Sequence, residues 1–132
     1  KFIEKLSPEM CGIGPFVPHK DTKFKSENHG DVSLVLMLLS IIRLLKPNIL
    51  LPATTALGTV DPLGREKGIL HGANVVMPNL SPVKHRKDYS LYDNKICTGD
   101  EAAQCIGCLA DRMKKIGYEI VTDRGDYTEN YD

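Results

Sequence analysis

The chain has 132 residues, of which 42% are hydrophobic and 26% charged, an ordinary composition for a folded domain with a buried core. Seventeen Lys and Arg residues balance seventeen Asp and Glu residues, so no net charge draws the chain to nucleic acid or to an anionic membrane. The longest apolar run, 32–45, is too short to span a bilayer and contains Ser40 and Arg43. We therefore expect neither a nucleic-acid partner nor a membrane partner.

The first residues, Lys1 to Leu6, lack an initiator Met and the layout of a signal peptide, and they look like the last turn of a helix. This pattern predicts that the chain begins within a larger fold. Four Cys residues without a secretory signal favour reduced thiols or metal ligands over a disulfide framework. The expected location is cytoplasmic.

Three apolar stretches share one design, in which a buried strand is stopped by a proline that cannot donate to a sheet ladder. The predicted strands are Met10 to Val17, Asn48 to Leu51 and Ala73 to Met77, followed by Pro18, Pro52 and Pro78 respectively.

Helices are predicted between these strands. Residues 31–45, flanked by Gly30 and Pro47, are apolar on nearly every face, which is typical of a helix packed between a sheet and another surface. Residues 64–71 predict a short helix ended by Gly72. This alternation indicates an α/β fold with parallel strands and right-handed crossovers.

The pattern changes after the third strand. Residues 81–91 predict a helical turn, residues 100–117 a helix, and residues 118–122 one more strand, whereas the tail from Asp123 has no periodicity and is expected to be frayed. Three parallel strands leave two unpaired edges, so something else should complete the sheet. We expect the isolated chain to self-associate, unless the segment from Tyr118 folds back over an edge.

Cys97, Cys105 and Cys108 form the strongest local signal for chemistry. Cys105 and Cys108 share one face of the predicted helix, and Cys97 lies in the loop before it. Thiolates select zinc or iron–sulfur clusters, and zinc would prefer a fourth ligand that the sequence does not supply. Three free thiols, or a redox pair at Cys105 and Cys108, are the alternatives. Cys11, within an apolar stretch, is interpreted as a small buried hydrophobe.

The second signal comes from the strand ends, because ligands of parallel α/β folds bind beyond the carboxyl ends of the strands. Thr54 and Thr55 offer hydroxyl and N–H groups suited to a carboxylate, or they simply cap a turn. Met77 would share the same rim. Tyr89 and Tyr92, three residues apart, would face one way from a helical turn, a spacing equally typical of core packing.

Three motifs in the chain resemble a known family: MCGIGPFVPH at 10–19, LPATTALGT at 51–59 and GANVVMPN at 72–79. The family is that of the radical S-adenosylmethionine (SAM) maturases of FeFe-hydrogenase of the HydE type, relatives of biotin synthase and methylornithine synthase. The resemblance extends to about Gly117, and so covers nearly the whole chain.

The resemblance implies a complete (β/α)8 TIM barrel in the parent enzyme. Residues 1–92 would supply the last βα units, as the carboxyl-terminal half of the barrel, and residues 93–132 a carboxyl-terminal helical extension with the three-cysteine cluster site. The amino-terminal half of the barrel would be the missing partner. SAM and substrate would meet in the lumen. By position, Met10, Thr54 and Thr55 resemble residues of the cofactor-binding region, and three others resemble substrate-lining residues, namely Met77, Tyr89 and Tyr92.

In that family a reduced 4Fe-4S cluster on a CxxxCxxC motif cleaves SAM to a radical, which attacks a sulfur-containing or organometallic small-molecule substrate. The motif is absent here, so the chain alone is expected to be inactive. By resemblance, Cys97, Cys105 and Cys108 match the ligands of an auxiliary 2Fe-2S or 4Fe-4S cluster. Two alternatives stay open: a biotin-synthase-like enzyme with another substrate, and a stand-alone metal-binding or electron-transfer module.

Overall fold

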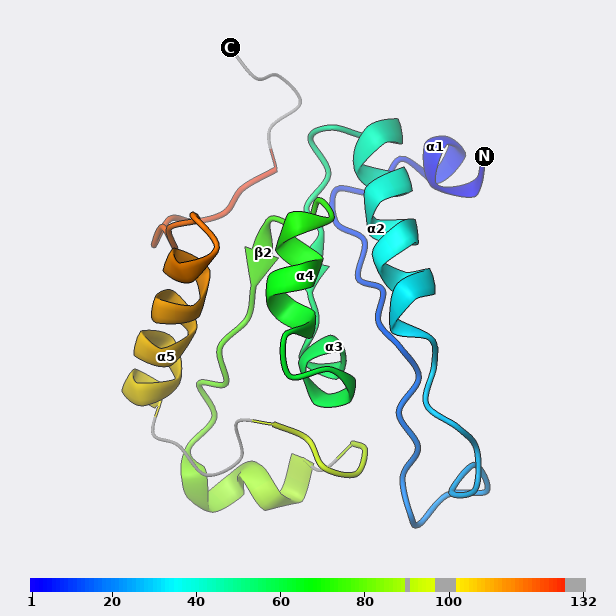
Figure 1. The fold of residues 1–132 in the computed structure, drawn as a ribbon, viewed down its shortest axis with the longest axis vertical. Helices are drawn as coiled ribbons and strands as arrows, with labels where there is room; N and C mark the ends of the chain where they lie inside the picture. The colour runs from blue at the N-terminus through cyan, green and yellow to red at the C-terminus, as the bar shows by residue number, and fades with distance from the viewer. Residues whose placement is uncertain (90, 97–101, 128–132) are drawn as a thin grey trace.

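The computed structural model describes residues 1–89, 91–96 and 102–127. Figure 1 shows short strands at the centre, with helices beside them. In chain order the elements are α1 (Phe2–Leu6), α2 (Val32–Leu45), β1 (Pro52–Ala53), α3 (Thr55–Val60), α4 (Gly64–Leu70), β2 (Val75–Val76), the 3-10 helix η1 (Val83–Tyr89) and α5 (Ala102–Lys115).

The sheet is small and parallel. β1 pairs with β2 in a register that sets Pro52 opposite Val75 and Ala53 opposite Val76. An isolated parallel bridge joins Met10 to Leu50, so the first extended segment lies beside the residues that lead into β1. The predicted α/β class with parallel strands is confirmed at this level. A two-stranded sheet does not establish a barrel, and the half-barrel stays a prediction.

The predicted strand boundaries were wrong in four places. Within 10–17 only Met10 forms a bridge, and the rest is extended chain outside any strand. β1 lies at Pro52–Ala53 instead of 48–51, because proline at 52 is accommodated inside the pairing. β2 covers only the centre of the predicted 73–77 stretch, and residues 118–122 form no strand.

Helix α2 confirms the predicted helix over 31–45. It begins after Asp31, whose side chain accepts a hydrogen bond from the Ser33 N–H at 2.7 Å. One face is buried in the core, whereas the opposite face is exposed, and among the described residues no second surface covers it as the sequence predicted. The buried face consists of Val35, Leu36, Leu39 and Ile42.

Helix α4 confirms the predicted helix over 64–71, and glycine lets it approach β1 closely. A Cβ atom added at Gly68 would lie 3.2 Å from the Cβ of Ala53. Gly72 follows the helix at a positive φ of 102°, a conformation that favours glycine. Helix α3 was not predicted, because only Thr54 and Thr55 at its start were interpreted, as ligand-binding residues or as the cap of a turn.

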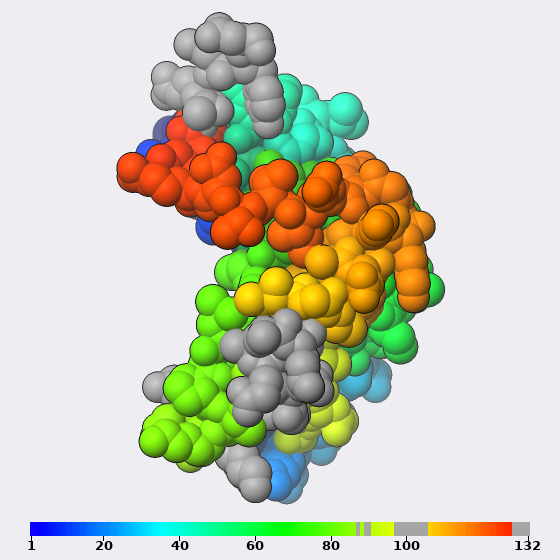
Figure 2. Space-filling view, turned by 90° about the vertical axis from the view of Figure 1, so that its left-hand side faces the viewer, coloured from blue at the N-terminus to red at the C-terminus, as the bar shows by residue number. Residues whose placement is uncertain are grey.

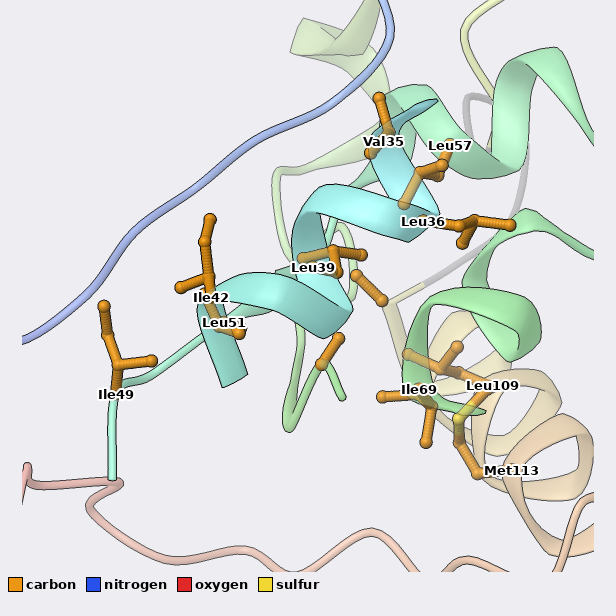
Figure 3. Packing of buried hydrophobic residues seen from close by; sticks show 12 residues of the cluster. Val35, Leu36, Leu39, Ile42, Ile49, Leu51, Leu57, Ile69, Leu109 and Met113 are labelled. Carbon is orange, nitrogen blue, oxygen red and sulfur yellow. The ribbon is translucent and has the colours of Figure 1, made fainter. Parts of the chain in front are cut away.

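Helix α5 and the tail complete the molecule. Figure 3 shows Leu109 and Met113 of α5 facing Ile69 of α4, and all three side chains belong to the core. Beyond α5 the segment 118–125 crosses the face shown in Figure 2 and contributes to a pocket, and residues 121–126 are exposed and form neither helix nor strand. No helix in the described part of the chain has the length and apolar character of a membrane span.

Substituting two leucines of α2 should change the free energy of unfolding by very different amounts. Leu39 is fully buried, whereas Leu44 is 81% exposed. We expect Leu39→Ala to lower the free energy of unfolding by about 2–5 kcal/mol, since it leaves a cavity. Leu44→Ala should change it by less than about 0.5 kcal/mol. Urea titrations followed by circular dichroism measure both, and equal effects would contradict the orientation of α2.

Candidate functional site

The ends of β1 and β2 and the extended segment after Met10 meet at one level. The register of the Met10–Leu50 bridge, continued along the chain, places Gly14 beside Thr54. The register of β1 and β2 places Met77 on the other side of Thr54. The close approach is real for Gly14, where an added Cβ would lie 2.6 Å from the Thr54 Oγ1 atom. This level is the carboxyl end of the strands, the place where ligands of such folds bind.

Both threonines at this level make local hydrogen bonds. Thr54 is the N-cap of α3, and its Oγ1 atom accepts from the Leu57 N–H at 3.4 Å. Thr55 Oγ1 accepts from Nη2 of the buried Arg65 at 3.5 Å. Thr54 therefore has a capping role, at the start of helix α3. A ligand contact at either threonine stays a prediction.

Met10 and Met77 lie together in a pocket of about 560 Å³. The pocket is bounded by both strand segments, by the end of α5 and by the tail. Four of its apolar lining residues come from elements far apart in the sequence, namely Leu50, Val75, Met113 and Ile120. The lining includes neither Thr54 nor Thr55, so the structure divides the predicted cofactor-binding residues between this pocket and the start of α3.

The two tyrosines follow at the carboxyl end of the strands. Tyr89 is the last residue of η1, and its side chain lies outside the described residues. Tyr92 is half-buried in the segment 91–96, which two hydrogen bonds join to Pro18 of the first extended segment and to Thr59 of α3. The Asp93 N–H donates to the Pro18 carbonyl at 3.1 Å, and the Ile96 N–H to Thr59 Oγ1 at 3.5 Å.

The three cysteines are only partly described. Cys97 lies outside the described residues, and Cys105 is placed only by its backbone in α5. Cys108, one helical turn further on, is exposed. Among the described residues no three His, Cys, Asp or Glu side chains gather into a possible metal site. The cluster therefore stays a prediction.

A partly buried ion pair holds the cysteine-bearing helix to the rest of the fold. Arg112 of α5 donates through both Nε and Nη2 to the two carboxylate oxygens of Glu66 on α4, each at 2.6 Å. Arg112 also donates to the Pro62 carbonyl. Nothing in the sequence predicts this contact, because its partners are 46 residues apart and neither belongs to a motif.

The ion pair changes the ionisation of Glu66. Burial raises the pKa of this carboxyl, but hydrogen bonds from Arg112 and from its own backbone N–H, with the nearby charges of Arg112 and Arg65, outweigh burial. The net result is a pKa below the ordinary value of 4.5.

The lowered pKa predicts a pH dependence of stability. Because folding lowers the pKa of Glu66, its contribution is complete well above pH 4.5 and is lost as the pH falls through the folded pKa. We expect Glu66→Gln to cost about 1–3 kcal/mol at pH 7, and the difference from wild type to shrink below pH 4.5. Urea unfolding at several pH values tests this expectation.

Other acidic groups cancel when the stability of wild type is compared with that of Glu66→Gln at each pH. Asp61, hydrogen-bonded to Lys67, and Glu4, beside the terminal amine, also have lowered pKa values, but they titrate alike in both proteins. A difference that stays constant down to pH 3 would contradict the ion pair as its source.

Comparison with known proteins gives the class to which this chain is similar. No family model matches it. Over 124 residues, 94% of its length, it is 41% identical to a protein that matures [FeFe] hydrogenase. That relative is the [FeFe] hydrogenase maturase subunit HydE of Thermotoga maritima. The resemblance predicted from the three motifs is thereby confirmed. The chain spans 36% of the length of this relative.

Proposed function

We propose that this chain is part of a radical-SAM enzyme that assists the assembly of the active site of FeFe hydrogenase. The observation that carries the proposal is the 41% identity over 94% of the chain to HydE. Because the chain spans 36% of that relative, the remaining parts of the enzyme, including the CxxxCxxC motif, would come from its amino-terminal half-barrel. The location proposed for this enzyme is cytoplasmic.

The arrangement of the strands supports a half-barrel. Met10, Leu50 and the β1–β2 pair bring three segments together in parallel and in chain order, as consecutive strands of a (β/α) barrel do. Helices α2 and α4 follow the first and second of these segments and pack with Leu51 in one core. The strands therefore have a helix-covered side, and the pocket beside Met10 and Met77 would belong to the lumen.

The proposed substrate side is the pocket that Met10 and Met77 line together. Thioethers are soft and adaptable, which suits a sulfur-containing or organometallic small molecule. In this proposal Met10 contacts SAM, and Thr54 and Thr55 hold the cofactor region at the strand ends. Tyr92, beside the same ends, would line the substrate with Met77 and Tyr89.

The proposed auxiliary cluster site rests on the chemistry of its donors. Cys105 and Cys108 are three residues apart in the sequence of α5, a spacing that would suit two thiolate ligands of one cluster. Cys108 is exposed, and α5 is fixed by the ion pair between Arg112 and Glu66. An iron–sulfur cluster bound there would supply a one-electron redox centre. The chain's own part is to hold two thiolates on a rigid helix, with Cys97 as the third ligand.

Loss of iron binding on substitution tests the cluster site. After anaerobic reconstitution with iron and sulfide, we expect the wild-type chain to show bound iron and visible absorption. Cys105→Ala with Cys108→Ala should lose both, because two of three thiolates are removed. Cys11→Ala is the matched control, since Cys11 packs against the core. Equal iron in the wild type and the double variant would refute the site.

The enzyme assignment is tested with a chimera in which this chain replaces the matching 124 residues of HydE from Thermotoga maritima. With dithionite and SAM, the chimera should form 5'-deoxyadenosine, whereas this chain alone should form none, since it has no CxxxCxxC motif. A folded chimera without SAM cleavage contradicts the proposed function. Formation of 5'-deoxyadenosine by this chain alone would contradict the proposal that the amino-terminal half-barrel supplies the CxxxCxxC motif.

A further inference from the structure

The exposed face of α2 is a continuous apolar stripe. Its six residues are spaced so that they repeat along one side of the helix, and their exposed fractions run from 38% to 81%. They are Leu34, Met37, Leu38, Ile41, Leu44 and Leu45. The single charged residue of the helix, Arg43, lies off this stripe and donates from Nε to the Gly72 carbonyl at 2.8 Å. The stripe therefore carries no charge.

The size of the stripe sets it apart from ordinary surface. Six half-exposed large side chains present an apolar area on the order of 500 Å², at the upper end of the largest patch of a typical monomer. Helix α1 adds two further exposed apolar side chains, Phe2 and Leu6. It lies near the end of α2, where Lys46 Nζ donates to Ser7 Oγ (Figure 1). A surface of this composition is typical of an interface.

We propose that a second copy of this chain covers the stripe, with the two α2 helices packed antiparallel about a two-fold axis. Leu34, Met37, Ile41 and Leu44 follow the three-and-four spacing of helices that pack side by side. An antiparallel pair sets Leu34 against Leu44 of the second copy, and Met37 against Ile41, so the stripe is complementary to itself.

Charge and area both favour this occupant. Asp31 lies just before α2 and Lys46 just after it, so antiparallel pairing brings opposite charges together at each end and aligns the helix dipoles favourably. Two stripes would bury about 1,000 Å² in total, near the lower limit for a specific interface. The inference concerns the chain by itself and does not depend on the proposed function.

Light scattering coupled to size exclusion tests the dimer. From about 1 to about 200 µM, a range that brackets the affinity expected of a small interface, the wild-type chain should shift from 14.6 kDa toward twice that mass. Met37→Lys with Ile41→Lys should weaken association at least tenfold. Leu44→Lys should also weaken it, and since Leu44 is the most exposed residue of the stripe, this variant keeps the fold. Circular dichroism confirms folding.

Ile106→Lys is the matched control, because Ile106 is 44% exposed on α5, which lies on the other side of the strands from α2 (Figure 1). It should leave the dimer unchanged. A wild-type chain that stays monomeric at the highest concentration overturns the proposal. So does a dimer that survives the Lys substitutions at Met37, Ile41 and Leu44, since the copies would then meet elsewhere, as at the open sheet edges.

Discussion

Proline at position 52 constrains the sheet, because it removes one N–H from the strand pair at its centre. The chain meets this constraint through Asn74. The Leu51 N–H, just before the proline, donates to the side-chain oxygen of Asn74 at 2.8 Å, and the Leu51 carbonyl accepts from the N–H groups of Asn74 and Val75. These three bonds fix β1 against β2 without an N–H from Pro52. The register that results places Thr54 level with Met77 at the strand ends.

With the register fixed, the two faces of the strands acquire different surroundings. Leu51 and Ala53 enter the core with α2 and α4, and Gly68 allows the close approach of α4. On the pocket side Met10 and Met77 keep about half of their surface exposed beneath the tail. Pro52, between Leu51 and Ala53, is also fully buried, so the space for a ligand or for further strands lies in the pocket beside Met10 and Met77.

The carboxyl-terminal helix depends on one polar contact as well as on packing. Leu109 and Met113 fill the space beside Ile69, but apolar contacts alone allow a helix to slide or rotate. The bidentate pair of Arg112 and Glu66 has a fixed geometry that opposes both movements. The backbone of α5 at Cys105 and Cys108 is therefore held in a defined orientation relative to α4.

The sequence by itself determined the helices over 32–45 and 64–70, the parallel order of the strands and the family resemblance, because periodicity, capping residues and distinctive motifs are local properties. It misplaced the strands around Pro52 and missed α3, since strand pairing depends on a distant partner, here Asn74. Only the tertiary structure decided which face of α2 is buried, which predicted residues share the pocket, and which carboxylate holds Arg112. Each of these depends on side chains that meet across the fold, which no local pattern of residues encodes.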